Sequence, residues 1–194
     1  MRRRDFCKSV VPAAAAFSGA GSLLMAADIP RDAPDLVVTM PNGRAPIRLS
    51  QFKGKVIAVE FILTTCSHCQ RASRTSEILY RELGPKGFQV IGAAINPGGD
   101  VVAYQRDFNL TFPVGSASQD TCLWFMQHPA MLRLLMPQAA FVDRNFKIVA
   151  QHAGDSPFFG DSEEKNMRDL VTKLLGPAAG GAPAKKAPAK KKAS

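Results

Sequence analysis

The amino-acid sequence predicts an α/β domain in which a mixed central sheet is flanked by helices. Apolar runs of strand length alternate with stretches of helical periodicity through most of the chain. Near the end, two strand-like runs joined by a short turn precede a last amphipathic helix. A Cys-x-x-Cys motif lies where the most apolar run meets a helix. This junction is therefore the first place to look for chemistry.

The composition is that of one globular domain with tails. The chain has 194 residues, of which 46% are hydrophobic and 21% charged, and this length accommodates one domain of ordinary size. The formal net charge of +9 comes almost wholly from residues 1–27 and 177–194, and the part between them carries about +1. Because the basic excess lies at the ends, we expect no nucleic-acid partner for the folded domain.

The first 27 residues have the features of a signal peptide. A charged start, Arg2-Arg3-Arg4, precedes a weakly apolar stretch over residues 10–25, and small residues follow. The run Arg3-Arg4-Asp5-Phe6-Cys7-Lys8 resembles a twin-arginine export signal. The apolar stretch is too short and too poor in Leu and Ile for a stable membrane span. These features predict an exported protein in the periplasm or another extracytoplasmic space.

Composition also marks the limits of the folded part. Residues 28–34 indicate a linker, residues 35–176 one domain, and residues 177–194, rich in Ala, Pro and Lys, a disordered tail. Removal of the signal leaves three cysteines, Cys66, Cys69 and Cys122. Their number and the close spacing of the first two do not fit a disulfide-stapled scaffold. Cys122 lies in an apolar helical stretch, where we expect it to pack in the core.

The first half of the domain predicts a hairpin, a central strand and a long helix. Residues 35–40 and 45–49 form an N-terminal β-hairpin around the turn Pro41-Asn42-Gly43. Residues 55–61 are nearly continuously apolar, as a central buried strand should be. A helix is expected from about Cys66 to Leu83, where Gly84 and Pro85 end it.

The second half predicts two more strands with helices, then the closing strand pair and helix. Residues 88–95 and 111–114 are expected as strands, with a helix between them that Asp100 caps and that ends near residue 108. A helix over residues 121–135 must be kinked or divided at Pro129. Residues 138–142 and 146–152 indicate an antiparallel pair, and residues 163–175 the last helix.

The Cys66-Ser67-His68-Cys69 motif is suited to thiol–disulfide exchange. A cysteine at a helix N-terminus is stabilised as a thiolate by unpaired backbone N–H groups and the helix dipole. The thiolate attacks a substrate disulfide, and Cys69, one turn further along and more buried, resolves the mixed disulfide. His68 is expected to add to the stabilisation of the Cys66 thiolate. Glu60, an acid inside an apolar strand, is a candidate proton shuttle beneath Cys69.

From about residue 35 to residue 175 the chain resembles the TlpA/ResA-like branch of the thioredoxin superfamily, a branch related to the AhpC/TSA and Redoxin groups. The matching features are the hairpin, the run 49–55, the Cys-x-x-Cys after the strand, and Pro137 before a strand that ends in Asp143. The resemblance implies a thioredoxin fold and a cis peptide bond before Pro137. It also implies that Met136 and Pro137 form a substrate platform facing the disulfide.

The resemblance implies protein substrates and a redox partner, with no cofactor and no resident metal. We expect a monomer that exchanges disulfides with envelope proteins. Three positions depart from the family pattern. Thr65 stands where relatives usually have Trp, and the loop 96–100 offers Asp100 as the candidate for an acid that relatives often carry there. Ser67-His68 resembles the Pro-His of DsbA-type oxidants, so the pair could work as an oxidant or as a reductant.

Two other functions are compatible with such a fold. A peroxiredoxin places Thr or Ser three residues before its cysteine and Pro seven before it, whereas Leu63 and Val59 occupy those positions here, which disfavours a peroxidase. A copper chaperone would use soft thiolates such as Cys66 and Cys69 with His68. Export by the twin-arginine route, which is often used for folded or metal-loaded cargo, keeps this alternative open.

Overall fold

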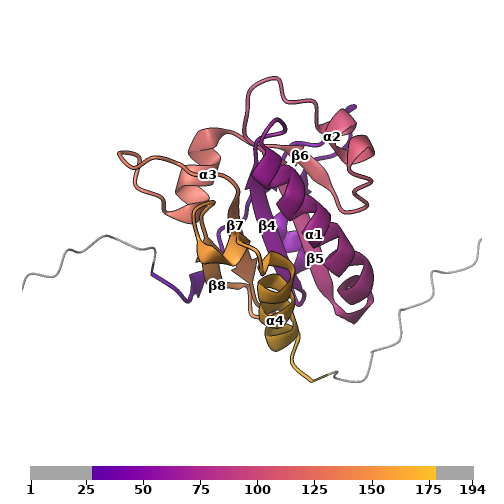
Figure 1. The fold of residues 1–194 in the computed structure, drawn as a ribbon, viewed down its shortest axis with the longest axis vertical. Coiled ribbons are helices and arrows are strands. Elements are labelled where there is room, and N and C mark those ends of the chain that lie inside the picture. The colour runs from indigo at the N-terminus through magenta and orange to yellow at the C-terminus, as the bar shows by residue number, and fades with distance from the viewer. Residues whose placement is uncertain (1–27, 178–194) are drawn as a thin grey trace, which may run out of the picture.

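The computed structural model describes residues 28–177, which form a six-stranded sheet with helices on both faces (Figure 1). The strand order is β1-β8-β7-β4-β5-β6. The strands are β1 (Arg31–Asp32), β4 (Val56–Ile62), β5 (Phe88–Ala94), β6 (Val114–Ser116), β7 (Gln138–Val142) and β8 (Lys147–His152). The helices are α1 (Ser67–Leu83), α2 (Val101–Asp107), α3 (Gln119–Met126) and α4 (Glu163–Leu175).

Strand β4 is the centre of the sheet. It runs parallel to β5 and antiparallel to β7, and all seven of its residues are buried. This burial explains its nearly continuous apolar sequence, because helices cover it from both sides. Alternate residues of β4 point to opposite faces. Val56, Ala58 and Ile62 therefore join one apolar core, and Ile57, Val59 and Phe61 join the other.

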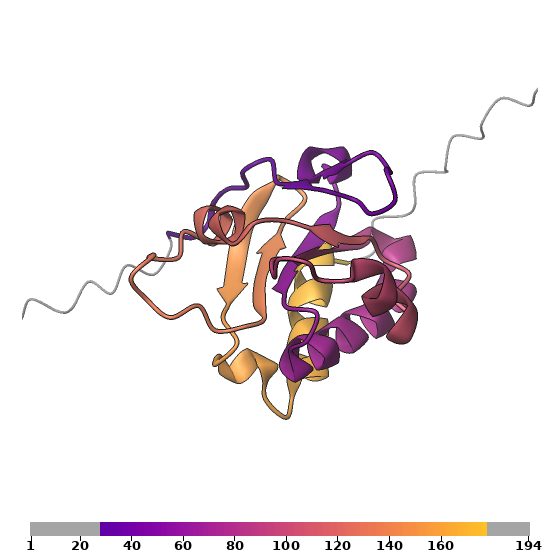
Figure 2. The ribbon, with the colours of Figure 1, turned by 90° about the horizontal axis from the view of Figure 1, so that it is seen from above.

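The two faces of the sheet carry different helices, as the view from above shows (Figure 2). Helices α1, α2 and α4 cover one face together with the 3-10 turn η3 (Pro157–Phe159). Helix α3 and the 3-10 turn η1 (Leu49–Phe52) cover the other. A third 3-10 turn, η2 (Gly84–Lys86), joins α1 to β5. The predicted α/β class with a mixed sheet is confirmed.

The N-terminal hairpin is confirmed as β2 (Val37–Val38) paired antiparallel with β3 (Ile47–Arg48). The segment 28–34, expected as a linker, contains a short strand, because β1 pairs with β8 at the edge of the sheet. The Lys147 ammonium and the Asp32 carboxylate form an ion pair at 2.9 Å, and the Ala33 N–H donates to the Phe146 carbonyl at 2.9 Å. These contacts hold the incoming chain against the domain.

The structure corrects two predicted elements. Helix α3 ends at Met126 rather than near residue 135, because Gln127 adopts the left-handed conformation and Pro129 disfavours helical continuation. The chain from Gln127 to Pro137 then contains no regular helix or strand. Strand β6 begins at Val114, where the prediction had a strand ending. The predicted helix over 163–175 matches α4, which ends at Gly176.

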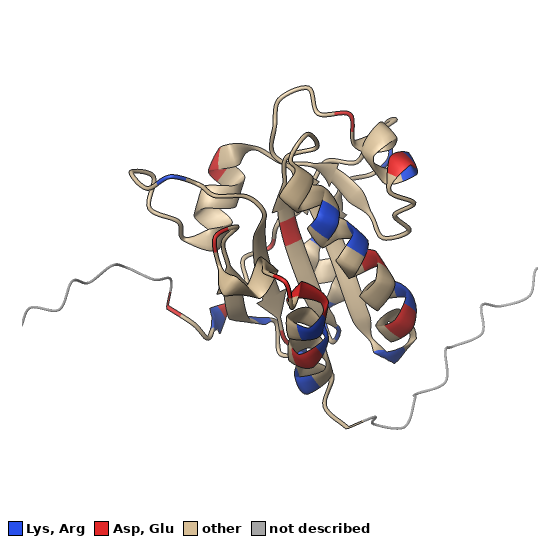
Figure 3. Ribbon diagram, in the orientation of Figure 1, with Lys and Arg blue, Asp and Glu red and all other residues tan. Residues whose placement is uncertain are grey.

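The predicted signal peptide and almost all of the predicted tail lie outside the described residues. Within residues 28–177, no helix combines the length and the apolar character that a membrane crossing requires. Charged residues of both signs gather on α1 and α4, whereas α3 and the chain that follows it carry few (Figure 3). The two helix-covered faces therefore differ in charge as well as in position.

Candidate active site

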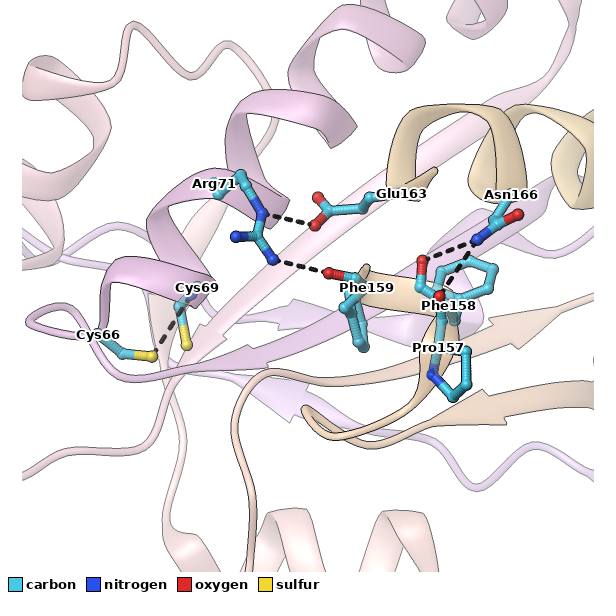
Figure 4. A network of polar contacts seen from close by, with 8 residues as sticks. All are labelled: Cys66, Cys69, Arg71, Pro157, Phe158, Phe159, Glu163 and Asn166. Atoms are coloured by element: carbon cyan, nitrogen blue, oxygen red, sulfur yellow. Dashed lines mark hydrogen bonds and ion pairs between the residues drawn. The ribbon is translucent and has the colours of Figure 1, made fainter. Parts of the chain in front are cut away.

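The Cys-x-x-Cys pair lies where β4 passes into α1. Cys66 is the N-cap of α1, with an extended backbone at φ −87° and ψ 120°. Its Sγ accepts a hydrogen bond from the Cys69 N–H at 3.4 Å, as a capping oxygen would do (Figure 4). The Cys66 side chain is partly exposed. Its sulfur therefore lies at the positive end of the helix dipole and within reach of solvent.

Cys69, one turn along α1, is fully buried. The backbone N–H of Leu63 donates to its Sγ at 3.5 Å. Burial raises the pKa of the Cys69 thiol far above its ordinary value, and the neighbouring Cys66 and Glu60 add to the increase. Both cysteines are free thiols in this structure. The two sulfurs therefore differ in exposure, and burial makes the Cys69 thiol a weak acid.

The loop between β4 and α1 is fixed by Asn96, the residue that follows β5 by two positions. Asn96 Oδ1 accepts from the Thr64 N–H at 3.0 Å, and its Nδ2 donates to the Thr64 hydroxyl at 3.0 Å. Parallel strands β4 and β5 bring their carboxyl ends to the same edge of the sheet, which places Asn96 beside this loop. The two hydrogen bonds hold the backbone that leads into Cys66.

Glu60 lies on β4, on the face that carries Cys69, and is fully buried. Its neighbours in the sheet are Gly92 of β5 and Ala139 of β7, whose small side chains leave room for the carboxyl group. Ser76 donates to Oε1 in a short hydrogen bond, and Ser73 donates to Oε2 at 3.4 Å. Burial raises the pKa of Glu60 to about 7, with a further increase from the charge of Glu163.

Tyr104 of α2 extends this polar group. Its hydroxyl donates to the Ser73 Oγ at 3.0 Å, which connects α2 through α1 to the Glu60 carboxyl. Burial raises the pKa of the Tyr104 hydroxyl, so it remains a neutral donor. Cys69, Ser73 and Ser76 are spaced by four and three residues and therefore lie on one face of α1. That face is turned toward Glu60.

Met136 and Pro137 lie at the same edge of the sheet as Cys66. The peptide bond between them is cis, as the family resemblance implied. In the antiparallel pairing of β4 with β7, Phe61 faces Gln138, so Pro137 continues this register toward Ile62 and the loop that carries the cysteines. Met136 and Cys66 both pack against the core formed by α1, α2 and α4.

Gly154 allows the neighbouring loop to approach this turn. A Cβ atom at Gly154 would lie 2.2 Å from the Met136 carbonyl oxygen, a distance that no real side chain tolerates. The Gly154 N–H donates to the Leu135 carbonyl at 3.1 Å, and the Gln138 side chain donates to the same carbonyl. The backbone before Pro137 is thus held from two sides.

The structure brings most of the predicted site residues together and leaves two apart. Cys66, Cys69 and Glu60 meet around the first turns of α1, and Met136 with Pro137 lies at the adjoining sheet edge. Asp100 caps α2 instead, where its exposed carboxylate accepts from the Ala103 N–H at 2.8 Å. His68 is exposed on α1, and within residues 28–177 no hydrogen bond joins its ring to Cys66.

Sequence reasoning missed several residues that support the site: Asn96, Ser73, Ser76, Tyr104 and Gly154. The spacing of Ser73 and Ser76 from Cys69 would have placed them on one helix face, and the position of Asn96 after a parallel strand would have placed it at the sheet edge. The contributions of Tyr104 and Gly154 depend on tertiary contacts and have no local signal. Across the described part of the chain, no cluster of three or more His, Cys, Asp or Glu side chains is arranged to hold a metal ion.

An ion pair lies beside the two cysteines and joins α1 to α4 (Figure 4). The Arg71 Nε lies 3.0 Å from the Glu163 Oε2, and its Nη2 donates to the Phe159 carbonyl at 2.7 Å. Glu163 is 4% exposed. Asn166, one turn further along α4, donates to the Pro157 and Phe158 carbonyls. This network fixes η3 and the start of α4 against the helix that carries the cysteines.

Comparison with known protein families gives this geometry a context. The AhpC/TSA family model matches residues 29–151, which is more than half of the chain. The chain belongs to the AhpC/TSA family. The match covers the sheet up to β8 together with the cysteine-bearing junction, and it agrees with the resemblance found in the sequence.

The curated relatives that match this AhpC/TSA chain align with less than half of its residues. It is 32% identical over 92 residues to the thiol-disulfide oxidoreductase ResA of Geobacillus kaustophilus, a match that covers 47% of this chain and 52% of the relative. It is 31% identical over 88 residues to a Xenopus laevis protein named "Probable glutathione peroxidase 8-A", covering 41% of this chain and 42% of that protein. The chain thus spans about half the length of the curated relatives it matches.

Solved structures confirm the thioredoxin fold. A thiol:disulfide interchange protein of the thioredoxin family from Chlorobium tepidum superposes on this AhpC/TSA chain with a TM-score of 0.64 at 20% sequence identity, covering 78% of this chain and 100% of the other. At this identity the likeness concerns the fold. The predicted fold, a mixed sheet flanked by helices after an N-terminal hairpin, is thereby confirmed.

Proposed function

We propose that this protein is a thiol–disulfide oxidoreductase that works through Cys66 and Cys69. The observation that carries the proposal is the difference between the two sulfurs. The Cys66 sulfur caps a helix and is accessible, whereas the Cys69 sulfur is buried one turn along, on the face of α1 that is turned toward Glu60, a carboxyl group with a pKa of about 7. An accessible thiolate can attack, and a buried thiol held beside a base can be activated afterwards. The ResA relatives are named for the same chemistry.

In the reducing direction, the Cys66 thiolate attacks one sulfur of a substrate disulfide. A bond forms between Cys66 and that sulfur, the substrate S–S bond breaks, and the second substrate sulfur leaves as a thiolate that takes a proton from water. Cys69 then gives its proton to the Glu60 carboxylate and attacks Cys66. The internal disulfide forms, the first substrate sulfur leaves as a thiolate that takes a proton from water, and the substrate is released as a dithiol, while the proton on Glu60 returns to solvent. The oxidising direction is the reverse.

Glu60 serves in this proposal as the base for Cys69. A carboxyl group with a pKa of about 7 accepts a proton near neutral pH far better than an ordinary Glu does. The high proton affinity of the Cys69 thiol keeps it protonated until a base takes the proton. Asp100 has no such position, because its carboxylate caps α2 in solvent. We therefore assign the proton transfer to Glu60 alone.

We assign substrate binding to Met136 and Pro137. Both adjoin the sheet edge where Cys66 is exposed, and the hydrogen bonds around Gly154 and Leu135 hold their backbone in place. A protein segment that carries a disulfide can lie along this edge with a sulfur facing Cys66. His68, exposed in the first turn of α1, is assigned to the support of the Cys66 thiolate. The substrates in this proposal are folded or folding proteins, and a second thiol–disulfide protein restores the pair.

The proposal includes export. The run Arg3-Arg4-Asp5-Phe6-Cys7-Lys8 supports the twin-arginine route, and it directs the protein to an oxidising space in which disulfides occur in proteins. Replacement of Arg3 and Arg4 by Lys should leave the precursor in the cytoplasm. Export of the Lys variant at the wild-type level would contradict the twin-arginine route.

The decisive experiment traps the substrate. A Cys69→Ser variant, expressed in the native envelope, should accumulate mixed disulfides on Cys66 that appear on non-reducing gels and disappear with dithiothreitol. A Cys66→Ser variant is the matched control and should trap nothing. Mass spectrometry of the released partners would identify the substrates. Equal trapping by both variants, or none by Cys69→Ser, would contradict the proposed function.

A peroxidase function has one specific observation in its favour, the match to a protein named as a glutathione peroxidase. The residues at the cysteine oppose it, because Leu63 and Val59 stand where a peroxiredoxin needs a hydroxyl and a proline. Addition of hydrogen peroxide to the reduced protein tests this directly. We expect slow oxidation, at the rate of an ordinary thiol, alongside rapid exchange with glutathione disulfide. The exposed His68 gives no specific support to the copper-chaperone alternative.

A further inference from the structure

Helix α4 contributes a second buried carboxyl group close to the one proposed as the base. Glu163 begins α4 and is 4% exposed. Its Oε2 is paired with Arg71, whereas its Oε1 is buried and has no hydrogen-bond partner within the described residues. A buried carboxylate oxygen without a partner is costly. A feature of this kind at the edge of an active site calls for an explanation.

Glu163 and Glu60 are linked through α1 and α4. Ser76, which donates to Glu60, also contacts the Met167 sulfur at 3.2 Å. Met167 lies four residues after Glu163 and therefore on the same face of α4, one turn away. Arg71, the partner of Glu163, follows Cys69 by two residues on α1. Both carboxyl groups are thus bonded to α1, Glu60 through Ser76 and Glu163 through Arg71.

We propose that Glu163 is a positioning residue of the active site, which acts through Glu60 on the proton exchanged with Cys69. This inference rests on the proposed function, because it concerns a proton of that reaction. Two buried carboxyl groups close together cannot both be charged without mutual repulsion. Glu163 is ion-paired with Arg71 at 3.0 Å, whereas the partners of Glu60 are the hydroxyls of Ser73 and Ser76, so the proton goes to Glu60.

Among residues 28–177, no cation is among the groups that act on Glu60. Cys69, Ser73 and Ser76 lie beside it on α1, and Tyr104 is reached through Ser73 from α2. From α4, Met167 contacts Ser76, and the charge of Glu163 acts on Glu60. The neighbouring strands contribute Gly92 and Ala139. Of these groups only Glu163 brings a charge that is fixed by an ion pair. Its effect is to make Glu60 a stronger base, which favours removal of the Cys69 proton.

The Arg71–Glu163 pair lies at the boundary between core and solvent. The Arg71 side chain is half exposed, and an open surface pocket beside the pair is lined by Arg71, Thr75, Gly160, Asp161, Glu163 and Glu164. Because Arg71 remains solvated, it can hold Glu163 charged without being buried itself. The Glu163 carboxylate, paired with Arg71, therefore lies just below the protein surface.

The test measures the titration of Glu60 in the reduced protein by carbon-13 NMR of the glutamate carboxyl groups, with Glu60→Gln to assign the signal. In Glu163→Gln, whose amide oxygen can still accept from Arg71, the Glu60 midpoint should fall by about one pH unit. Resolution of a preformed mixed disulfide on Cys66 should slow by roughly threefold at pH 8, since a weaker base removes the Cys69 proton.

Two controls separate this effect from a structural one. Glu164→Gln removes the adjacent charge, which is exposed and paired with Arg168 at 2.9 Å, and should leave the Glu60 midpoint and the rate unchanged. Glu163→Asp keeps the charge and should keep the midpoint near the wild-type value. If Glu163→Gln does not fold, Glu163→Leu replaces it, because Leu fills a similar volume without burying an amide. The Glu60 midpoint should fall in this variant as well.

An unchanged Glu60 midpoint in Glu163→Gln or Glu163→Leu would overturn the inference and leave the proposed function intact. A wild-type protein that exchanges no disulfides would overturn the proposed function and the catalytic part of the inference, while the Glu60 titration would still decide the electrostatic part. A lowered midpoint in both Glu163→Gln and Glu164→Gln would also overturn it, because any nearby charge would then suffice.

Discussion

The two faces of the central sheet each bury a cysteine, and they surround it differently. Cys69 lies among α1, α2 and α4, next to Glu60, Ser73 and Tyr104. Cys122 of α3 lies in the opposite core, packed with residues such as Phe61 and Phe125. Burial raises the pKa of both thiols, that of Cys122 to about 12. A buried thiol acquires a chemical role only where a base and an accessible second sulfur are placed beside it.

The alternation of β4 creates this difference. Its residues on the α3 side are apolar throughout, and on the α1 side the same strand carries Glu60 between Ala58 and Ile62. A single carboxyl group thus converts one face of a structural core into a site where protons can be held. Charged residues follow the same division, since they gather on α1 and α4 (Figure 3).

The largest expected difference between the two faces is in activity. Cys66→Ser should lower the rate of exchange with a disulfide substrate by on the order of a thousandfold or more, because the attacking thiolate is lost. Cys122→Ser should leave the rate within about twofold, since Cys122 only fills space. Stopped-flow reduction of glutathione disulfide measures both. A comparable loss in Cys122→Ser would mean that the apolar face also takes part in the chemistry.

The next largest effect is on stability and its dependence on pH. The pKa of Glu60 is about 7 in the folded state and near 4.5 when unfolded, so the stabilisation from its bound proton is complete below pH 4.5 and is lost as the pH rises through 7. This corresponds to about 3 kcal/mol of unfolding free energy between pH 4.5 and 8. Urea titrations should show that Glu60→Gln removes this dependence and is the more stable protein at pH 8. Phe125→Ala, in the other core, should destabilise the protein equally at both pH values.

A smaller effect is expected from Ser76, which donates to Glu60. Ser76→Ala removes a hydrogen bond that favours the charged carboxylate, so the pKa of Glu60 should rise further. We expect a loss of about 2 kcal/mol in unfolding free energy at pH 8 and less at pH 5, where Glu60 is protonated. The control is Thr121→Ala in α3, whose hydroxyl makes an exposed hydrogen bond with the Ser118 hydroxyl at 2.8 Å. If the loss of unfolding free energy in Ser76→Ala is the same at pH 5 and pH 8, Ser76 does not act on the charged form of Glu60.

The smallest effect is on redox potential. His68 is exposed at the second position of α1, where Pro is tolerated. His68→Pro should make the dithiol more reducing by tens of millivolts, because an imidazole that can stabilise the Cys66 thiolate is lost, and 30 mV corresponds to about 1.4 kcal/mol. Glutathione titration measures the potential. Equal reduction potentials in wild type and variant would mean that His68 has no effect and that the helix N-terminus sets the potential of the cysteine pair.

The sequence alone determined the parts of this protein that depend on local chemistry. The apolar run of β4, the Gly-Pro end of α1, the turn at Pro41-Asn42-Gly43 and the Cys-x-x-Cys spacing each follow from a few neighbouring residues. Cys66, Cys69 and Glu60 could therefore be selected as candidates before the fold was known, and the family resemblance added Pro137. The end of α3 was misjudged, because a helical pattern continues past Met126 while the backbone at Gln127 and Pro129 does not.

Only the tertiary structure decided what surrounds Glu60. Ser73, Tyr104 and Glu163 reach it or affect it from three helices, and Asn96 fixes the cysteine loop from a neighbouring strand. The structure likewise assigned Asp100 to a helix cap and not to the cysteines. The physical reason is that the energy of a buried charge depends on which distant groups share its desolvated space. That set of neighbours is a property of packing and has no signature along the chain.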